Sequence, residues 1–336
     1  MCDNFAMLHR SQDLSIQQTI FNYLDGVRLS RSANTYRTYR NAMQSFAQML
    51  MDSGVDVLKT PVTELQEEAI TWFSDSLKDL APTSERLYLT AATSLFEFIA
   101  AENLAQVNLP RIRLLIRQRA RRPGIRLPQF PNDDIEKVLE YMINITDQPP
   151  GDETQQLIDL RDRAFLITLA DTGLRVHEAC NLVRGAIDWK EYRAVIIGKG
   201  NRQDLVRFSE RSMVAVKRYL EARARIDGAG GKQLGRLPLF ARHDRAAGKS
   251  TRPITPTTGR NIVAERVAQV LGKDAVGTIT PHSFRHYFVT RVMRGSGNLK
   301  LAQELARHRN IAVTQRYAHL SNDELDKGYW DVFEKK

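Results

Sequence analysis

Two shortages in the sequence exclude whole classes of protein. The 336 residues contain two cysteines, Cys2 and Cys180, which excludes the disulfide framework of small secreted domains and favours a reducing compartment. No apolar run reaches the roughly 18 residues of a membrane-spanning helix, and the N-terminus lacks the charged and then apolar pattern of a signal peptide. We therefore expect a cytoplasmic protein with no membrane partner.

Motifs for nucleotides and metals are missing as well. The sequence has no glycine-rich phosphate loop and no cluster of carboxylates. His282 and His286 have the four-residue spacing of two zinc ligands, but no glutamate follows His282 and no cysteine pair accompanies them. We expect neither a metal nor a cofactor.

Basic residues outnumber acidic ones. The 49 Lys and Arg against 39 Asp and Glu give a net charge of +10, which suits a polyanionic partner such as double-stranded DNA but is also compatible with an ordinary basic protein. Residues 111–126 contain seven arginines and no acid, and Pro123, Gly124 and Pro128 mark a break. This pattern predicts a linker over residues 111–128 that either follows a phosphate backbone or is simply solvated. Its arginines are Arg111, Arg113, Arg117, Arg119, Arg121, Arg122 and Arg126.

The spacing of apolar residues predicts a mainly α protein with a small β-hairpin or sheet. In residues 1–110, apolar side chains recur every three or four positions, which indicates a helical bundle. By its spacing alone, such a bundle is typical of an oligomerisation module. We expect its helices at residues 15–27, 32–53, 62–80 and 83–102.

Residues 129–336 are expected to form an α+β domain. A β-branched run at residues 193–197 and a second run at 204–208 predict a hairpin whose turn carries Lys199. Helices are expected at residues 132–145, 154–172, 211–225, 258–271, 281–294, 299–307 and 311–319.

Three short stretches of this second domain contain side chains suited to phosphate chemistry. They are Thr172-Gly-Leu-Arg-Val-His-Glu178, Thr280-Pro-His-Ser-Phe-Arg-His286, and Leu305-Ala-Arg-His308 with Tyr317 nine residues later. A guanidinium presents paired donors to phosphate oxygens and stays charged at physiological pH, so Arg175 and Arg285 are candidates to clamp a phosphate. Each feature also has an ordinary explanation: Arg175 and Glu178 as a surface ion pair within one helix, and His286 as a core histidine.

The order and spacing of these residues resemble the tyrosine recombinase (integrase) family. The resemblance rests on motifs over residues 160–320 and on the helical pattern alone over residues 1–125. Two residues depart from the family pattern: Phe284 stands where leucine is usual, and Arg307 stands where glycine is usual. The resemblance implies a core-binding (SAM-like) bundle that binds DNA, in place of an oligomerisation module, followed by a tyrosine recombinase catalytic domain.

The resemblance also implies a role for each catalytic candidate. Tyr317 is the nucleophile, Lys199 protonates the leaving 5′ oxygen, His282 accepts a proton, and His308 donates to the phosphate. Glu178 and His286 support them. If Lys199 is not the acid, Lys232 and Lys249 are the alternatives. The reaction is two transesterifications through a 3′-phosphotyrosyl bond, without ATP or a divalent metal.

DNA contacts outside the catalytic set are expected on the second helix of the bundle. Tyr36, Arg37, Tyr39 and Arg40 mix aromatic and basic side chains, as a face that grips a DNA backbone does, and they are equally typical of half-buried surface.

Two rival functions share this chemistry or fold. One is a type IB topoisomerase, and the other is a DNA-binding protein that keeps an inactive recombinase fold. For the recombinase we expect a tetramer on DNA, with the tail after Tyr317 docked on a neighbouring protomer or folded back on its own domain. Because the chain begins almost directly with the bundle, a simple recombinase is expected rather than one with a separate arm-binding domain.

Overall fold

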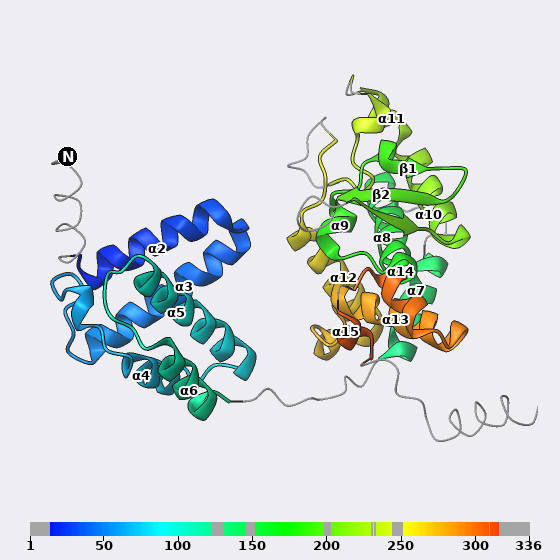
Figure 1. The fold of residues 1–336 in the computed structure, drawn as a ribbon. Helices are drawn as coiled ribbons and strands as arrows, with labels where there is room; N and C mark the ends of the chain where they lie inside the picture. The colour runs from blue at the N-terminus through cyan, green and yellow to red at the C-terminus, as the bar shows by residue number, and fades with distance from the viewer. Residues whose placement is uncertain are drawn as a thin grey trace, which may run out of the picture. The chain divides into compact units, whose positions relative to one another are not determined.

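The computed structural model describes residues 14–121, 131–145, 152–197, 203–229, 231, 233–243, 251–308 and 310–315. The chain divides into two compact units, residues 1–126 and residues 127–336. Figure 1 shows the ribbon of each unit, and each is described by itself.

The first unit is a bundle of α-helices. Ser15 and Ser32 begin the first two helices. Their hydroxyl groups accept hydrogen bonds from the backbone N–H groups of Gln18 and Thr35, which would otherwise have no partner at the start of each helix. The helices are α2 (Ile16–Ser30), α3 (Ala33–Asp52), α4 (Ala69–Ser76), α5 (Pro82–Ala101) and α6 (Leu109–Arg119), with a 3-10 turn η1 (Val62–Glu64).

The core of this bundle is aromatic and fully buried. Phe46 on α3 meets Phe73 on α4 edge-on, with ring centroids 5.1 Å apart, and meets Phe96 on α5 at 6.4 Å. Edge-to-face contacts of this kind add to the burial of apolar area. The predicted helical bundle is confirmed, although the helix expected at 62–80 is shorter and forms only η1 and α4.

The prediction of a linker at residues 111–128 is wrong for the first part of that segment. Residues 109–119 form α6, which packs against α4 and α5, and Ile112 on this helix is fully buried. Acids from earlier in the chain pair with its arginines: Glu67 and Glu68 with Arg111, Glu97 with Arg113, and Asp75 with Arg119. Just beyond the helix, buried Glu85 pairs with Arg121. Arg122 and the rest of the predicted linker lie outside the described residues.

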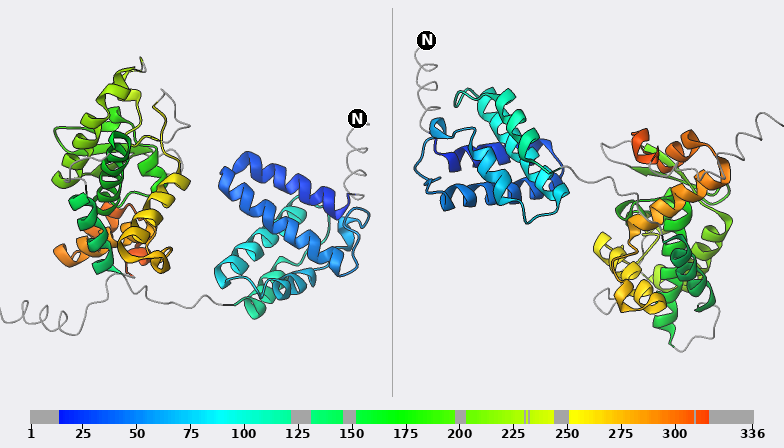
Figure 2. Two further views of the ribbon diagram at one scale, coloured as in Figure 1. Left: turned by 180° about the vertical axis from the view of Figure 1, so that it is seen from behind. Right: turned by 90° about the horizontal axis from the view of Figure 1, so that it is seen from below.

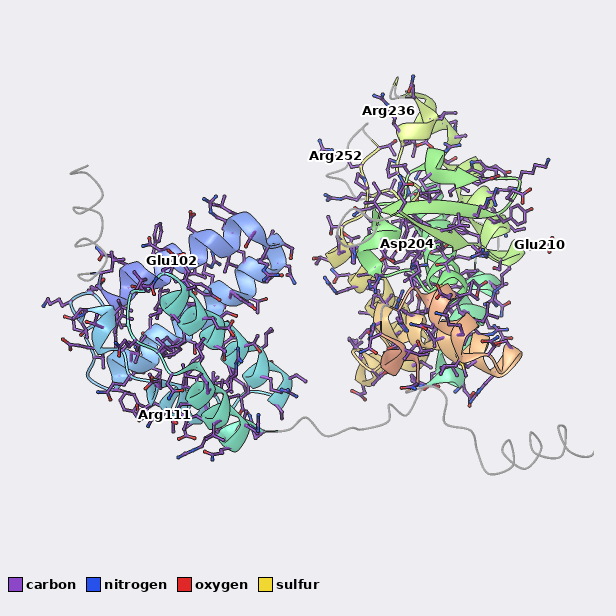
Figure 3. The ribbon with its side chains drawn as sticks, in the orientation of Figure 1. Glu102, Arg111, Asp204, Glu210, Arg236 and Arg252 are labelled. Carbon is purple, nitrogen blue, oxygen red and sulfur yellow. The ribbon has the colours of Figure 1, made fainter. Side chains whose placement is uncertain are left out.

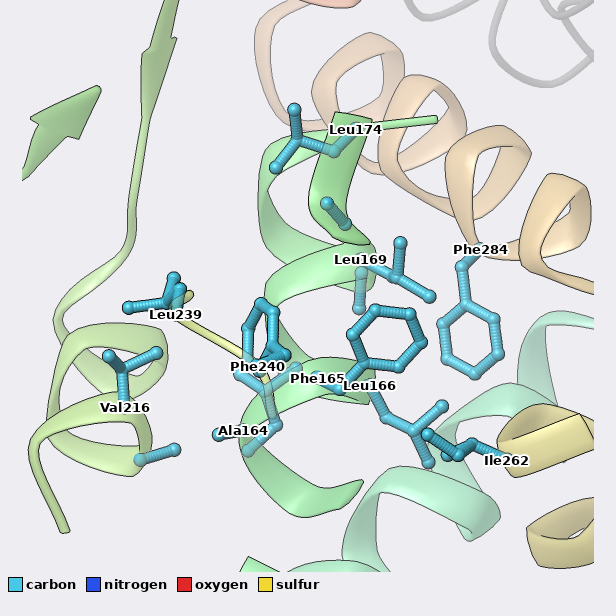
Figure 4. Close-up of a cluster of buried hydrophobic side chains, with 14 of the residues drawn as sticks. Ala164, Phe165, Leu166, Leu169, Leu174, Val216, Leu239, Phe240, Ile262 and Phe284 are labelled. Carbon is cyan, nitrogen blue, oxygen red and sulfur yellow. The ribbon is translucent and has the colours of Figure 1, made fainter. Parts of the chain in front are cut away.

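The second unit is built around one buried helix. α8 has apolar side chains on all sides, including Phe165, Leu166 and Leu169, and α7, α10 and α13 all pack against it (Figures 1 and 2). Figure 4 shows this core, in which Phe165 meets Phe240 edge-on at 5.2 Å and Phe284 lies nearby. The helices are α7 (Asn132–Ile145), α8 (Glu153–Thr172), α9 (Val176–Cys180), α10 (Glu210–Ala222), α11 (Ala224–Ala229), α12 (Pro256–Leu271), α13 (Pro281–Ser296), α14 (Leu299–Ala306) and α15 (Ile311–Gln315).

A small antiparallel sheet lies beside these helices, in the order β1-β2-β3. Its strands are β1 (Ile187–Asp188), β2 (Arg193–Ile197) and β3 (Gln203–Arg207), and short 3-10 turns occur at η2 (Arg184–Ala186), η3 (Leu234–Arg236) and η5 (Lys273–Ala275). Ala194 pairs with Val206, and both point into the core. The mainly α fold with a small sheet is confirmed, and Lys199 lies outside the described residues, between β2 and β3.

Candidate active site

The end of α8 positions the first arginine of the site. Gly173 ends α8 with φ +60°, and a Cβ built there would lie 2.4 Å from the Phe288 ring, so glycine is required by both backbone conformation and packing. Leu174 is buried behind this turn, and Arg175 then begins α9 with its side chain 44% exposed. The chain therefore turns out of the core at Arg175.

Glu178 anchors this arginine from one turn along α9. Its carboxylate accepts the backbone N–H of Arg175 at 2.8 Å and the Arg175 Nη1 at 2.8 Å, and its side chain is 2% exposed. Burial opposes ionisation of this carboxyl, but the Arg175 backbone N–H and the Arg307 guanidinium outweigh it and hold the pKa of Glu178 below its usual range. Glu178 is thus an ionised, buried carboxylate that holds Arg175 in place.

Arg285 joins three separate parts of the second unit. Thr280 and Ser283 cap α13 reciprocally, and Arg285 is the fifth residue of this helix. Its Nη1 donates to the Gly173 carbonyl and its Nη2 to the Ala306 carbonyl. Burial, then the neighbouring Arg175 and Arg307, lower the pKa of Arg285 to about 9, so the group remains protonated at pH 7.

His282 and His286 contact each other on α13. Their ring centroids are 4.1 Å apart and the rings are edge-on at 73°. Partial desolvation, and then the charges of Arg285 and Arg175, lower the pKa of His282. The core position considered for His286 is wrong, because this side chain is half-buried and lies against the His282 ring.

His308 follows α14 and is fixed on both its backbone and its ring. Its N–H donates to the Gln303 carbonyl at 3.0 Å, and its Nδ1 lies 2.9 Å from the hydroxyl of buried Thr314 on α15. Burial, then the charges of Arg285 and Arg175, lower the pKa of His308 to about 4, so the imidazole is neutral at pH 7. When the Thr314 hydroxyl donates to Nδ1, the ring proton is on Nε2, which is then the donor available to a substrate.

Arg307 is a member of this cluster that the sequence did not identify as functional. Its Nη2 lies 3.1 Å from Glu178 Oε2 and 3.4 Å from the Gly173 carbonyl oxygen. Its φ of +56° is in the left-handed region that favours glycine. The signal in the sequence was the replacement of the usual glycine at this position.

Four of the six predicted catalytic residues are described by the structure, and it brings them together. Arg285 hydrogen-bonds the carbonyls of Gly173 and Ala306, which precede Arg175 and His308 by two residues each, and His282 lies on the same helix α13. Tyr317 lies outside the described residues, as do Lys199 and its alternatives Lys232 and Lys249.

The predicted DNA-binding residues of α3 divide by type. Arg37 and Arg40 are exposed, whereas Tyr36 and Tyr39 are half-buried and pack against the core of the bundle. The aromatic side chains of this face are therefore structural, and the basic ones are available to a partner. Figure 3 shows the side chains of both units, with Arg111 labelled on α6.

Neither a metal cluster nor a membrane span is found in the part of the chain that the structure describes. No group of three or more His, Cys, Asp or Glu side chains there is placed to hold a metal ion. No described helix is long and apolar enough to cross a membrane.

Comparison with known proteins identifies the family. The model of the phage integrase family matches residues 130–324, more than half of the chain. The protein belongs to the phage integrase family. It is a tyrosine-type site-specific DNA recombinase, and the resemblance seen in its motifs is confirmed.

Individual relatives of this integrase are matched over most of their length. The chain is 29% identical to tyrosine recombinase XerD of Mycobacterium tuberculosis over 307 residues, which is 88% of this chain and 90% of that protein. It is 25% identical to tyrosine recombinase XerC of Actinobacillus pleuropneumoniae, over 91% of this chain and 90% of that protein.

Solved structures share the fold. The Tn1549 transposon integrase in complex with transposon right end DNA matches with a TM-score of 0.66 and 17% identity, over 96% of this chain and 100% of that one. The XerH site-specific recombinase bound to its difH substrate matches with a TM-score of 0.63 and 17% identity, over 94% of this chain and 84% of that one.

The lowered pKa of His308 in this integrase predicts an acid-sensitive site. Between pH 6.5, the usual histidine value, and about pH 4, the unfolded chain binds a proton at this position that the folded chain does not. Stability of the DNA-free protein should therefore fall as the pH is lowered through this window. Thermal unfolding at pH 7 and pH 5 would measure the fall in Tm, which should be smaller in His308→Gln. An identical fall in both proteins would contradict the assignment.

Proposed function

We propose that this integrase cleaves and rejoins double-stranded DNA through a 3′-phosphotyrosyl bond at Tyr317. The observation that carries the proposal is the convergence of three motifs far apart in the sequence. Arg285 on α13 hydrogen-bonds Gly173, two residues before Arg175, and Ala306, two residues before His308. One buried guanidinium thus fixes the spacing between the other two phosphate-binding candidates.

Each residue has a distinct task in the proposed reaction. Arg175 and Arg285 neutralise the non-bridging oxygens, and His308 donates a hydrogen bond to one of them from Nε2. Tyr317 attacks phosphorus, and the bond to the 5′ oxygen breaks. His282 takes the phenol proton, because its depressed pKa leaves it unprotonated at pH 7.

Lys199 is proposed to return a proton to the departing oxygen. The 5′ hydroxyl of the partner duplex then attacks the phosphotyrosyl bond and restores the tyrosine. Glu178 supports the reaction by holding Arg175, and His286 by contacting the ring of His282. The bond energy stays in the covalent link, so no nucleotide is consumed.

DNA is further bound by arginines of the first unit. On α3, Arg37 and Arg40 are exposed, and on α6 the side chain of Arg117 is exposed. The carboxylates paired with the other arginines of α6 restrict those side chains while leaving them partly exposed, which suits contact with phosphates. Arg111, Arg113, Arg119, Arg121 and Arg122 complete the proposed set.

We further propose that four protomers assemble on two DNA sites in the cytoplasm. The apolar stripe Leu325, Tyr329, Trp330 and Phe333 after the nucleophile would dock on the neighbouring protomer. Docking of this kind would link the position of one nucleophile to the state of the next.

A nicked duplex with the cleavage site beside the nick tests this function. The short strand diffuses away after cleavage, so the active protein should accumulate as a covalent adduct on denaturing gels. Two intact duplexes should then exchange strands, and light scattering should give four protomers in that complex. Plasmid relaxation without strand exchange would favour a topoisomerase, and absence of any adduct would favour an inactive DNA-binding protein.

A chain ending at His319 tests docking of the tail. It should bind single DNA sites but not assemble into a tetramer, and an intact tetramer of this shortened chain would contradict docking of the tail.

A further inference from the structure

We propose that Arg307 is a third guanidinium of the phosphate site and that its charge stabilises the transition state of strand cleavage. The inference rests on the proposed cleavage reaction. It adds a catalytic residue at a position where the family has glycine, so it concerns a property of this chain.

The backbone at residue 307 favours glycine, yet the chain has arginine there. Arg307 ends α14 with φ +56°, a conformation that costs any residue with a Cβ. Glycine would accept this conformation without strain. The arginine therefore carries a local cost that the fold of α14 does not require.

The buried guanidinium of Arg307 is also incompletely paired. Its side chain is 7% exposed, and among the described residues only Nη2 has acceptors, which are Glu178 and the Gly173 carbonyl. The Nε and Nη1 donors are closed to solvent and find no acceptor among the described residues. Buried donors of a charged group are costly when they lack an acceptor. A phosphate oxygen bound beside Arg285 would supply one when the Arg307 side chain turns toward it.

The charges of the described site explain what a third guanidinium adds. Arg175 and Arg285 are cations and Glu178 is an anion, while the lowered pKa of His308 keeps it neutral at pH 7. Without Arg307 these groups carry one net positive charge, and Arg307 raises it to two. In-line attack puts a second negative charge on the phosphate as the five-coordinate transition state forms. The additional guanidinium matches that second charge.

Glu178 alone does not account for the arginine. The carboxylate already accepts two hydrogen bonds from Arg175, one from its backbone and one from its side chain. Arg307, 129 positions later in the chain, adds a third hydrogen bond to this carboxylate. By engaging Glu178 Oε2, it also allows Arg175 to turn toward a substrate without leaving the carboxylate uncompensated.

The variant Arg307→Gly separates charge from folding. It keeps the backbone conformation and removes the guanidinium, so its Tm should be at least that of the wild type. Cleavage of the nicked duplex should be about 100-fold slower, at the low end of the loss typical of removing one preorganised donor at a developing charge. If the wild type cleaves and Arg307→Gly cleaves equally fast, this inference is overturned and the proposed function is left intact. Absence of cleavage by the wild type would instead defeat the proposed function.

A second substrate tests whether the effect is electrostatic. In a methylphosphonate at the cleavage site, a methyl group replaces one charged oxygen, so one fewer positive charge is needed. The ratio of wild-type to Arg307→Gly rate should fall below about threefold on this substrate. An equal ratio on both substrates would show a structural role and overturn the proposal. Arg225→Ala is the matched control, because Arg225 is 88% exposed on α11 and should give a ratio near one on both.

Discussion

Tyr317→Phe should eliminate the covalent adduct while leaving DNA binding unchanged. Phenylalanine keeps the ring and removes only the oxygen that attacks phosphorus, so packing is preserved and chemistry is lost. We expect adduct formation to fall by more than about a thousandfold, as is typical when a nucleophile is removed. Denaturing gels of the nicked duplex measure the adduct, and a gel-shift titration measures binding.

Tyr287→Phe is a suitable control for that experiment. The Tyr287 hydroxyl donates to Glu136 and accepts from Arg291, and its ring is buried in the core of the second unit. This variant should retain the adduct. An adduct that persists in Tyr317→Phe would assign the nucleophile to another residue.

The helices and the core were predictable from the sequence because their signals are local. Apolar spacing within single segments indicated the bundle and the buried α8, and β-branched runs indicated the strands β2 and β3. These features depend on neighbours within a few residues.

Contacts between distant segments were not predictable in the same way. Arg111 pairs with Glu68, 43 positions earlier, so a run of arginines that resembles a linker forms a helix of the bundle instead. Arg307 pairs with Glu178, 129 positions earlier, so its place in the site appears only in the fold. In both cases the compensating acid lies outside any local window.

Arg285→Ala should slow cleavage by about a hundredfold or more, the loss typical of removing one preorganised donor from a developing charge. Within the described part of the chain, two of its five N–H donors hold the Gly173 and Ala306 carbonyls, and the other donors are proposed to face a phosphate. Loss of both hydrogen bonds to these carbonyls should also lower stability by about 1–3 kcal/mol. Cleavage must therefore be measured at a temperature where both proteins are folded. DNA affinity should change far less than the cleavage rate, and equal losses in both would mean that Arg285 only holds DNA.

A substrate with sulfur in place of the leaving 5′ oxygen distinguishes charge stabilisation from proton donation. A thiolate departs without a proton, so this substrate should restore cleavage to Lys199→Ala if Lys199 is the acid. It should not restore cleavage to Arg285→Ala, because the charge on the phosphate oxygens is unchanged and still lacks its guanidinium. Rescue of both variants would mean that leaving-group departure limits each, and rescue of neither would transfer the acid role to another residue.

Arg285 joins the turn before Arg175 to the turn before His308, so its loss should also disturb both of these residues. The cleavage rate of the double variant Arg175→Ala, Arg285→Ala should therefore fall by less than the product of the two single losses in rate.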